Sequence, residues 1–148
     1  MRSYFWVAVG AGLGGALRYW CGEIAAALLG DIFPWGTMLV NVLGSFIIGF
    51  FAMLTAPEGR LVVSLIIRQF VMVGFCGGYT TFSAFSLQTQ EFMQRGEWLY
   101  VSANIVSIAL SLFAVWVGHE SAAALNPPPA IETNACEIED FARVPAGP

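Results

Sequence analysis

The chain has 148 residues, enough for one domain, and it is 57% hydrophobic but only 11% charged, with a net charge of −4 and no lysine. Soluble domains carry about 25% charged residues. This composition therefore argues against a soluble domain and for an integral membrane protein, whose surroundings are a lipid bilayer and for which we expect no nucleic-acid partner.

The positions of the charges predict the transmembrane helices. Charged residues are absent from three stretches that each exceed the roughly 20 residues needed to cross a ~30 Å hydrocarbon core as a helix: 32–57, 69–90 and 98–118. A fourth stretch is apolar apart from Arg18 and Glu23. We therefore expect an all-α membrane protein with four transmembrane helices, at about 4–29, 36–55, 62–93 and 98–118.

The first expected helix follows Arg2 as a signal peptide would, but three further spans follow it, so we expect it to be retained. It contains Gly10, Gly12 and Gly15 at the spacing of a dinucleotide-binding loop. No strand–helix alternation follows, so Gly10, Gly12 and Gly14 favour close helix packing instead. Burying Arg18 at bilayer depth costs free energy. Its side chain either has a structural role, reaching to the membrane surface or to carbonyls at a helix end, or forms an electropositive vestibule for anions.

Asn41 is the polar residue of the second expected helix, in the stretch GTMLVNVLGSF, which carries no charge. A lone Asn in a span often hydrogen-bonds a neighbouring helix, but its amide N–H groups can also donate to an anion. Gly44 and Gly49 on the same helix favour close packing.

The third expected helix contains GFCGGYTTFSAFSLQTQ, residues 74–90, which is rich in Gly, Ser, Thr and Gln without any charge. Gly74, Gly77 and Gly78 come just before Thr80, and each glycine costs about 1 kcal/mol against alanine in a helix, so we expect a break here. Backbone carbonyls that lose their helical hydrogen bonds at bilayer depth are tolerated only where protein, water or an ion contacts them. Such carbonyls are suitable ligands for a hard cation such as Na⁺.

Phe82 and Phe85 follow the expected break at i, i+3 spacing, interleaved with Ser83 and Ser86. The two rings either form an aromatic packing face or turn their positive edges toward an anion. Hydroxyls and ring edges could then replace part of the anion's hydration without a fixed cation that would trap it.

On the fourth expected helix, Asn104, Ser107 and Ser111 share one helical face. They form either a polar track through apolar surroundings or a seam of interhelical hydrogen bonds. Together the four spans make up an expected membrane domain over residues 1–120.

Residues 121–148 hold five of the seven prolines, four acids and one base, and we expect a solvated, disordered tail that the core activity does not need. The three cysteines, Cys21, Cys76 and Cys136, fit neither a metal spacing nor a disulfide framework.

Four spans place both termini and the loop between the second and third helices on one side of the membrane. Arg2 and Arg60 lie on that side, with Arg143 and the deeper Arg68 as further candidates, against Arg95 on the other side. This arginine excess is too small to fix one topology. Four thin helices cannot enclose a pore alone, so we expect an oligomer.

Several motifs are similar to those of the Fluc fluoride channels, also called the CrcB family, over about residues 5–118. The motifs are GLGGALRYW (12–20), PWGTMLVNVLGSFIIGF (34–50), GFCGGYTTFSAFSLQT (74–89) and RGEW (95–98). The resemblance implies an ion channel rather than an enzyme, in the bacterial inner membrane, that exports cytoplasmic fluoride passively and so protects the cell. It also implies an antiparallel dual-topology homodimer with two pores and a break in the third helix that holds a central structural Na⁺.

The resemblance also implies roles for single residues. Phe82 and Phe85 match the pore-lining aromatic pair, with Ser83 between them placed in the pore, and Asn41 matches the polar pore residue of the second helix. The remaining matches are Arg18 as the first-helix arginine, the carbonyls of Gly77 and Thr80 as Na⁺ ligands, and Asn104, Ser107 and Ser111 as the polar track. Many family members have Glu where this chain has Gln88, which bears on the conduction rate.

The alternative to a channel is a small proton-coupled exporter of organic cations, also built from four helices. Such an exporter needs a membrane-embedded carboxylate. Glu23 lies near the end of the first expected span, beside Arg18, and the second span, the core of the third and the fourth contain no acid. A membrane enzyme is disfavoured because the single histidine, His119, lies at a helix end without a partner cluster.

Overall fold

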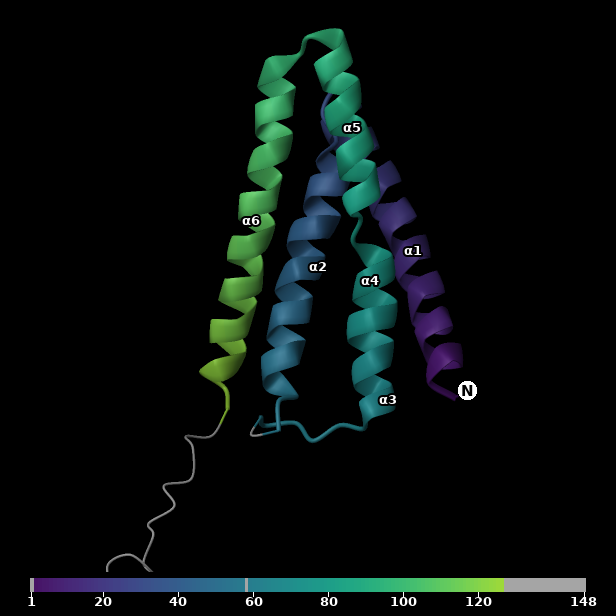
Figure 1. Cartoon of the computed structure of the whole chain (residues 1–148), viewed down its shortest axis with the longest axis vertical. Coiled ribbons are helices and arrows are strands. Elements are labelled where there is room, and N and C mark those ends of the chain that lie inside the picture. Colours follow the sequence, from purple (N-terminus) through teal and green to yellow (C-terminus); the bar gives the residue numbers. More distant parts are fainter. Residues whose placement is uncertain (1, 58, 127–148) are drawn as a thin grey trace, which may run out of the picture.

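The computed structural model describes residues 2–57 and 59–126, and it is built from helices (Figure 1). In chain order they are α1 (Arg2–Leu29), α2 (Trp35–Leu54), α3 (Leu65–Arg68), the π-helix η1 (Gln69–Cys76), α4 (Gly77–Tyr79), α5 (Phe82–Arg95) and α6 (Trp98–Ala123). The segments from α3 to α5 together form the third long helical stretch. The four long stretches lie where the charge pattern predicts helices.

Three of these stretches are long and apolar enough to cross a membrane: Trp35–Leu54, Leu65–Arg95 and Trp98–Ala123. The chain is thus a multi-pass, all-α membrane protein. α1, with 28 residues, has the length for a span, but it contains Arg18 and Glu23 and is less apolar than the other three. The fourth crossing stays a prediction.

The helix ends follow from local sequence. α1 is followed by Gly30 with φ +83°, a backbone conformation that glycine adopts without strain, and Pro34 immediately precedes α2. After α5, the N–H of Gly96 bonds to the carbonyl of Met93 and that of Glu97 to Phe92. This pair of bonds around a left-handed glycine is the Schellman motif, which turns the chain sharply into α6.

α2 lies at the centre of the bundle. It packs along most of its length against α6 and also contacts α1 and η1, while α1 packs against η1 and α4. Figure 1 shows the N-terminus, the loop after α2 and the end of α6 together at the lower end, and the α5–α6 turn at the upper end. Successive long helical stretches therefore run in alternating directions through the bundle.

Close helix approach depends on glycines. A Cβ atom on Gly14 of α1 would overlap the carbonyl oxygen of Phe75, and one on Gly78 would overlap that of Ala11. A Cβ atom on Gly10 would likewise lie too close to η1, at 2.6 Å from the carbonyl oxygen of Phe70. Gly12, which the sequence pattern groups with them, differs: it is exposed, and a Cβ atom there would have no neighbour within 4 Å, because Gly12 lies on another face of α1.

The third stretch is interrupted at Thr80 and Thr81, whose backbones are extended (ψ 160° and 118°). The preceding glycines remain helical; Gly77 has φ −63° and ψ −34°. The interruption thus follows the glycine cluster instead of lying within it. Thr81 then caps α5, because its Oγ1 accepts a hydrogen bond from the N–H of Ala84 (3.2 Å).

The end of α6 is tied to the loop after α2. The Asn126 side chain donates from Nδ2 to the carbonyl of Met53 (3.1 Å) and accepts at Oδ1 from the N–H of Arg60 (2.9 Å). Of the tail expected over 121–148, the part from residue 127 onward, with Cys136, lies outside the described residues. Cys21 and Cys76 are free thiols.

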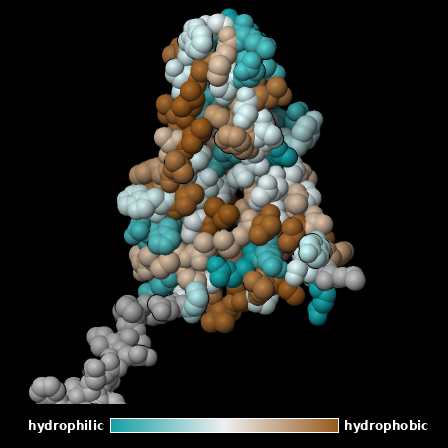
Figure 2. Space-filling model, in the orientation of Figure 1, coloured by the Kyte–Doolittle hydropathy of each residue, from teal (hydrophilic) through white to brown (hydrophobic). Residues whose placement is uncertain are grey.

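Apolar side chains cover much of the outer surface. Figure 2 shows them along the face formed by α6, with hydrophilic side chains gathered at the upper end where α5 finishes. Val62 is 95% exposed and Leu99 78% exposed. Such an apolar outer surface is typical of a protein that is surrounded by lipid or that packs against a further copy of itself.

Candidate functional site

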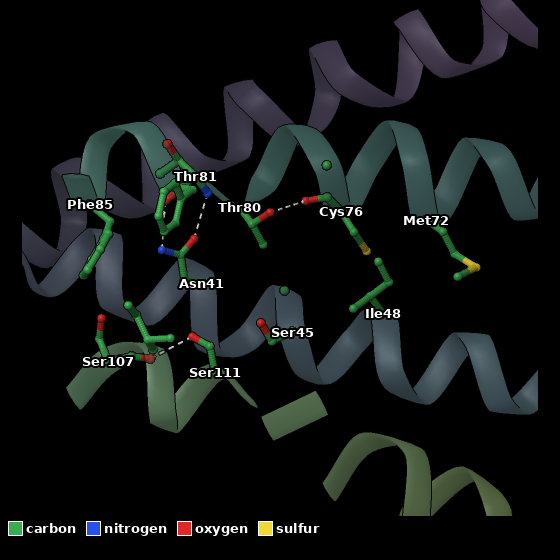
Figure 3. Close-up of a pocket in the computed structure, with 14 residues that line it drawn as sticks. Asn41, Ser45, Ile48, Met72, Cys76, Thr80, Thr81, Phe85, Ser107 and Ser111 are labelled. Atoms are coloured by element: carbon green, nitrogen blue, oxygen red, sulfur yellow. Dashed lines mark hydrogen bonds between the residues drawn. The ribbon is translucent and has the colours of Figure 1, made fainter. Parts of the chain in front are cut away.

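A cavity of about 270 Å³ lies between α2, the interrupted third stretch and α6 (Figure 3). None of its lining residues is charged: they are Asn41, Gly44, Ser45, Ile48, Met72, Cys76, Gly77, Thr80, Thr81, Phe82, Phe85, Ser107, Ile108 and Ser111. Five residues of the predicted pore are therefore brought to one place, namely Asn41, Phe82, Phe85, Ser107 and Ser111.

Asn41 holds the interruption in the third stretch. Its Nδ2 donates to the carbonyl of Thr81 (3.0 Å), and its Oδ1 accepts from the N–H of the same residue (2.7 Å). The side chain thus pairs with both backbone groups of one extended residue, as Figure 3 shows. An amide nitrogen carries two hydrogens, so one N–H of Asn41 remains for another acceptor.

The serine hydroxyls on the cavity wall bond to the backbone of their own helix. Ser107 Oγ donates to the carbonyl of Asn104 (2.6 Å), and Ser111 Oγ donates to that of Ser107 (2.9 Å). A hydroxyl can rotate about its C–O bond, so each can exchange a carbonyl for an anion in the cavity. Ser107 and Ser111, which helical spacing places on one face of α6, therefore both line the cavity.

The two phenylalanines are neighbours with different surroundings. Their ring centroids lie 5.5 Å apart with planes tilted by 33°. Phe85 is 7% exposed and packs inside the bundle, whereas Phe82 is 73% exposed. Both rings line the cavity, but the rest of the chain covers Phe85 and leaves most of Phe82 on the surface.

The interruption also frees carbonyl groups that suit a cation. In an unbroken helix the N–H of Thr81 would bond to the carbonyl of Gly77, but here it bonds to Asn41. Likewise the N–H of Ala84 bonds to Thr81 Oγ1, where a continuous helix would use the carbonyl of Thr80. Gly77 is exposed, and a Cβ there would have no neighbour within 4 Å. Diverted carbonyls beside open space fit a hard cation such as Na⁺.

Two of the predicted pore residues lie outside this cavity. Ser83 is exposed, and its Oγ lies 3.2 Å from Thr81 Oγ1 at the start of α5. Asn104 is fully buried, with 0% exposure, and bonds to α5 instead: its Nδ2 donates to the Phe85 carbonyl (3.2 Å) and to Thr89 Oγ1 (2.8 Å). At Asn104 the polar face of α6 therefore makes a hydrogen-bonded contact with α5.

Arg18 lines a different cavity of about 340 Å³, together with Glu23, Thr37 and Thr81. Among the described residues its guanidinium has neither an ion pair nor a hydrogen bond. Since Thr81 lines both cavities, Arg18 faces a space that adjoins the candidate site, and its role as a vestibule or structural residue stays a prediction.

Gln88 lies on a third cavity, of about 320 Å³, between the α1–α2 loop and the end of α5. Glu91 and Arg95 line it too. The Oε1 atom of Gln88 is buried without a hydrogen-bond partner among the described residues. At this position the chain thus has a neutral amide, where a glutamate would have a negatively charged carboxylate.

Several residues of the cavity were not predicted from the sequence. Ser45 and Ile48 follow Asn41 by four and seven positions, so helical spacing from Asn41 could have found them. Met72 and Cys76 come from η1, and no pattern in the sequence distinguishes them from residues that only pack.

Comparison with known proteins agrees with this architecture. Residues 5–119 match a family model described as CrcB-like protein, Camphor Resistance (CrcB). A fluoride-specific ion channel FluC from Methylocella silvestris is 53% identical over 125 residues, which are 84% of this chain and 95% of the relative. Proteins of the same name from Rhodospirillum rubrum (50% over 84% of this chain and 97% of the relative) and Opitutus terrae (51% over 85% and 96%) are similar too.

Proposed function

The chain belongs to the CrcB-like family, and from this premise we propose that it is a fluoride-selective ion channel, not an enzyme, through which cytoplasmic fluoride leaves the cell passively. The observation that carries the proposal is its identity of one half or more with channels named fluoride-specific, over almost their whole length. The uncharged cavity supports it, because its wall offers the kind of ligands that a small anion can bind and leave.

Fluoride is strongly hydrated, so a pathway must replace its water shell along the way. Asn41 supplies the second N–H of its side-chain amide, which does not bond to Thr81. Ser107 and Ser111 supply hydroxyls that can rotate toward the ion. Phe82 and Phe85 supply the positive edges of their rings. Since none of these groups has a full charge, binding stays weak enough for the ion to leave, as conduction requires.

We propose that two copies associate in antiparallel orientation, with two pores per homodimer. The support lies in Phe82, which lines the cavity and yet is mostly exposed in a single chain. A second copy that covers this side would complete the wall and bury the ring. The arginines at the two ends of the bundle also permit insertion in both directions.

A structural Na⁺ is the cofactor we propose for this homodimer. The carbonyls of Gly77 and Thr80 would hold it, since their helical partners bond elsewhere and no carboxylate is needed for such a site. The ion would neutralise bare carbonyls at the interruption and so hold the two halves of the third stretch in place.

We place the protein in the bacterial inner membrane, where such a channel protects the cell. Hydrogen fluoride enters as a neutral acid and ionises in the cytoplasm, so the trapped anion needs an exit. The segment from residue 127 onward is not part of the proposed pathway.

Fluoride efflux from liposomes that contain the purified protein tests this function. We expect fluoride to leave rapidly when a potassium ionophore relieves the charge imbalance, and chloride to be retained under the same conditions. Liposomes without protein are the control. Equal release of both anions, or no release of fluoride, would contradict the proposal.

A further inference from the structure

We propose that Asn104 is a positioning residue that sets the place of the Phe85 ring in the pathway by fixing α5 against α6. This inference rests on the proposed function, but it gives Asn104 a role different from that of a pore-lining group. It starts from the observation that Asn104 is fully buried and does not line the cavity that contains Phe85.

Three polar groups form a closed triangle between the two helices. Asn104 Nδ2 donates to the Phe85 carbonyl (3.2 Å) and to Thr89 Oγ1 (2.8 Å), while Thr89 Oγ1 donates to the same Phe85 carbonyl (2.8 Å). All three residues are at most 7% exposed. The triangle therefore acts directly on the backbone of the residue whose ring lines the cavity.

The triangle has no substitute elsewhere along this contact. Among the described residues, the two bonds donated by Asn104 are the only side-chain hydrogen bonds between α5 and α6, so they restrain the rotation of α5 about its own axis. At its start, α5 follows Thr81, which Asn41 of α2 holds by two bonds. Two amides from two different helices thus hold the short segment that carries Phe82 and Phe85.

The free-energy cost of burying Asn104 indicates that this residue serves to position Phe85 more than to stabilise the fold. Asn104 Oδ1 is buried without a hydrogen-bond partner among the described residues, and an unpaired buried acceptor destabilises the fold. An apolar residue of the same shape would avoid that cost. The presence of an asparagine here is explained if its two donated hydrogen bonds serve to hold Phe85 in position.

The structure therefore predicts that stability and conduction separate in Asn104→Leu. Leucine keeps the shape, removes the unpaired oxygen and leaves no buried donor without a partner, since Thr89 still donates to the Phe85 carbonyl. Replacing polar groups by apolar ones of equal shape can be nearly neutral for folding. The loss of two bonds that hold Phe85, in contrast, should slow fluoride about tenfold or more.

The test uses liposomes that each contain at most one channel assembly on average, so that extent and rate of release report different properties. The extent of fluoride release counts the vesicles with a working channel, and the rate per vesicle reports the pathway. A merely structural defect lowers the extent. We expect Asn104→Leu to keep the extent and slow the rate, whereas Ser102→Ala, an exposed change on the same helix, leaves both unchanged.

A second variant keeps the proposal testable if Asn104→Leu does not fold. Thr89→Val keeps the shape and removes one corner of the triangle, so it should also slow release, and the double variant should be no slower than Asn104→Leu alone. A wild-type rate in Asn104→Leu, or in Thr89→Val where Asn104→Leu fails to fold, overturns the proposal. So does a fall in extent alone. Wild-type protein that releases no fluoride instead refutes the function itself, and this inference with it.

Discussion

At the residue scale, Phe82 and Phe85 test how the anion is recognised. Replacing either ring by isoleucine keeps bulk and hydrophobicity but removes the positive aromatic edge. We expect Phe82→Ile and Phe85→Ile to remain folded, because near-volume swaps usually cost under about 1.5 kcal/mol, while fluoride efflux falls severely. Efflux from liposomes, with gel filtration of the same samples, measures both properties.

The matched control is Phe113→Ile, a change in an exposed ring of α6 (60% exposed) that does not line the cavity. It should conduct as the unchanged protein does. Efflux at the wild-type rate from folded Phe82→Ile and Phe85→Ile would mean that the rings only pack, and that amide and hydroxyl groups alone carry the ion.

Asn41 is expected to contribute to stability as well as to conduction. Asn41→Ala leaves the N–H and the carbonyl of buried Thr81 without their partner, and each unpaired buried group costs about 1–3 kcal/mol. We expect the free energy of unfolding to fall by about 2 kcal/mol or more, measured by denaturation in detergent. Ser45→Ala, one turn further along the same cavity wall, should change it by less than about 0.5 kcal/mol; equal losses in the two variants would speak against the Thr81 pairing.

At the element scale, the contact between α1 and the third stretch depends on helices that approach closely. Gly14→Ala places a methyl group against the backbone carbonyl of Phe75, which cannot move without shifting η1. Overpacking of this kind costs about 1–3 kcal/mol. We expect a clear fall in the thermal unfolding temperature of the purified protein in detergent.

Gly12→Ala is the matched control for this contact, two residues away on the same helix. Nothing lies within 4 Å of a Cβ at Gly12, and alanine is the better helix former by about 1 kcal/mol. Its unfolding temperature should stay the same or rise. If Gly14→Ala were as stable as Gly12→Ala, the close packing of α1 against η1 and α4 would be wrong.

At the scale of the whole molecule, the distribution of arginines bears on insertion. Arg2 begins α1, Arg60 lies in the loop after α2 and Arg68 ends α3. Figure 1 shows these segments at the end of the bundle with the N-terminus, whereas the end of α5, where Arg95 lies, is at the opposite end. Because orientation follows the excess of Lys and Arg in short loops, this small difference should let the chain insert both ways. A tag at the N-terminus should be protected from protease in about half of the molecules in sealed vesicles.

Added charge should remove this balance. Leu61→Arg with Val62→Arg, both exposed in the loop after α2, should place that loop in the cytoplasm in nearly all molecules and lower efflux, since antiparallel pairs could no longer form. Adding Ile32→Arg and Leu99→Arg near the other end should restore mixed protection. Uniform protection of the tag in the unchanged protein would refute dual topology.

The sequence by itself determined the membrane class, the positions of the long helices and the uncharged polar character of the third one. These properties depend on local hydrophobicity and on the lengths of charge-free stretches, so they can be predicted without knowledge of neighbours. The charge gap that ends at Pro57, for example, predicts a helix over 36–55, and α2 spans Trp35–Leu54.

Only the tertiary structure decided which polar groups meet. It pairs Asn41 with Thr81 across 40 residues of sequence. It also directs the Asn104 side chain to α5, while Ser107 and Ser111 of the same helical face line the cavity. It also buries Phe85 and leaves Phe82 exposed, three residues apart. The physical reason is that the rotation and height of each helix relative to its neighbours are set by packing between distant segments, such as the glycine contacts of α1, and a local pattern contains no information about that packing.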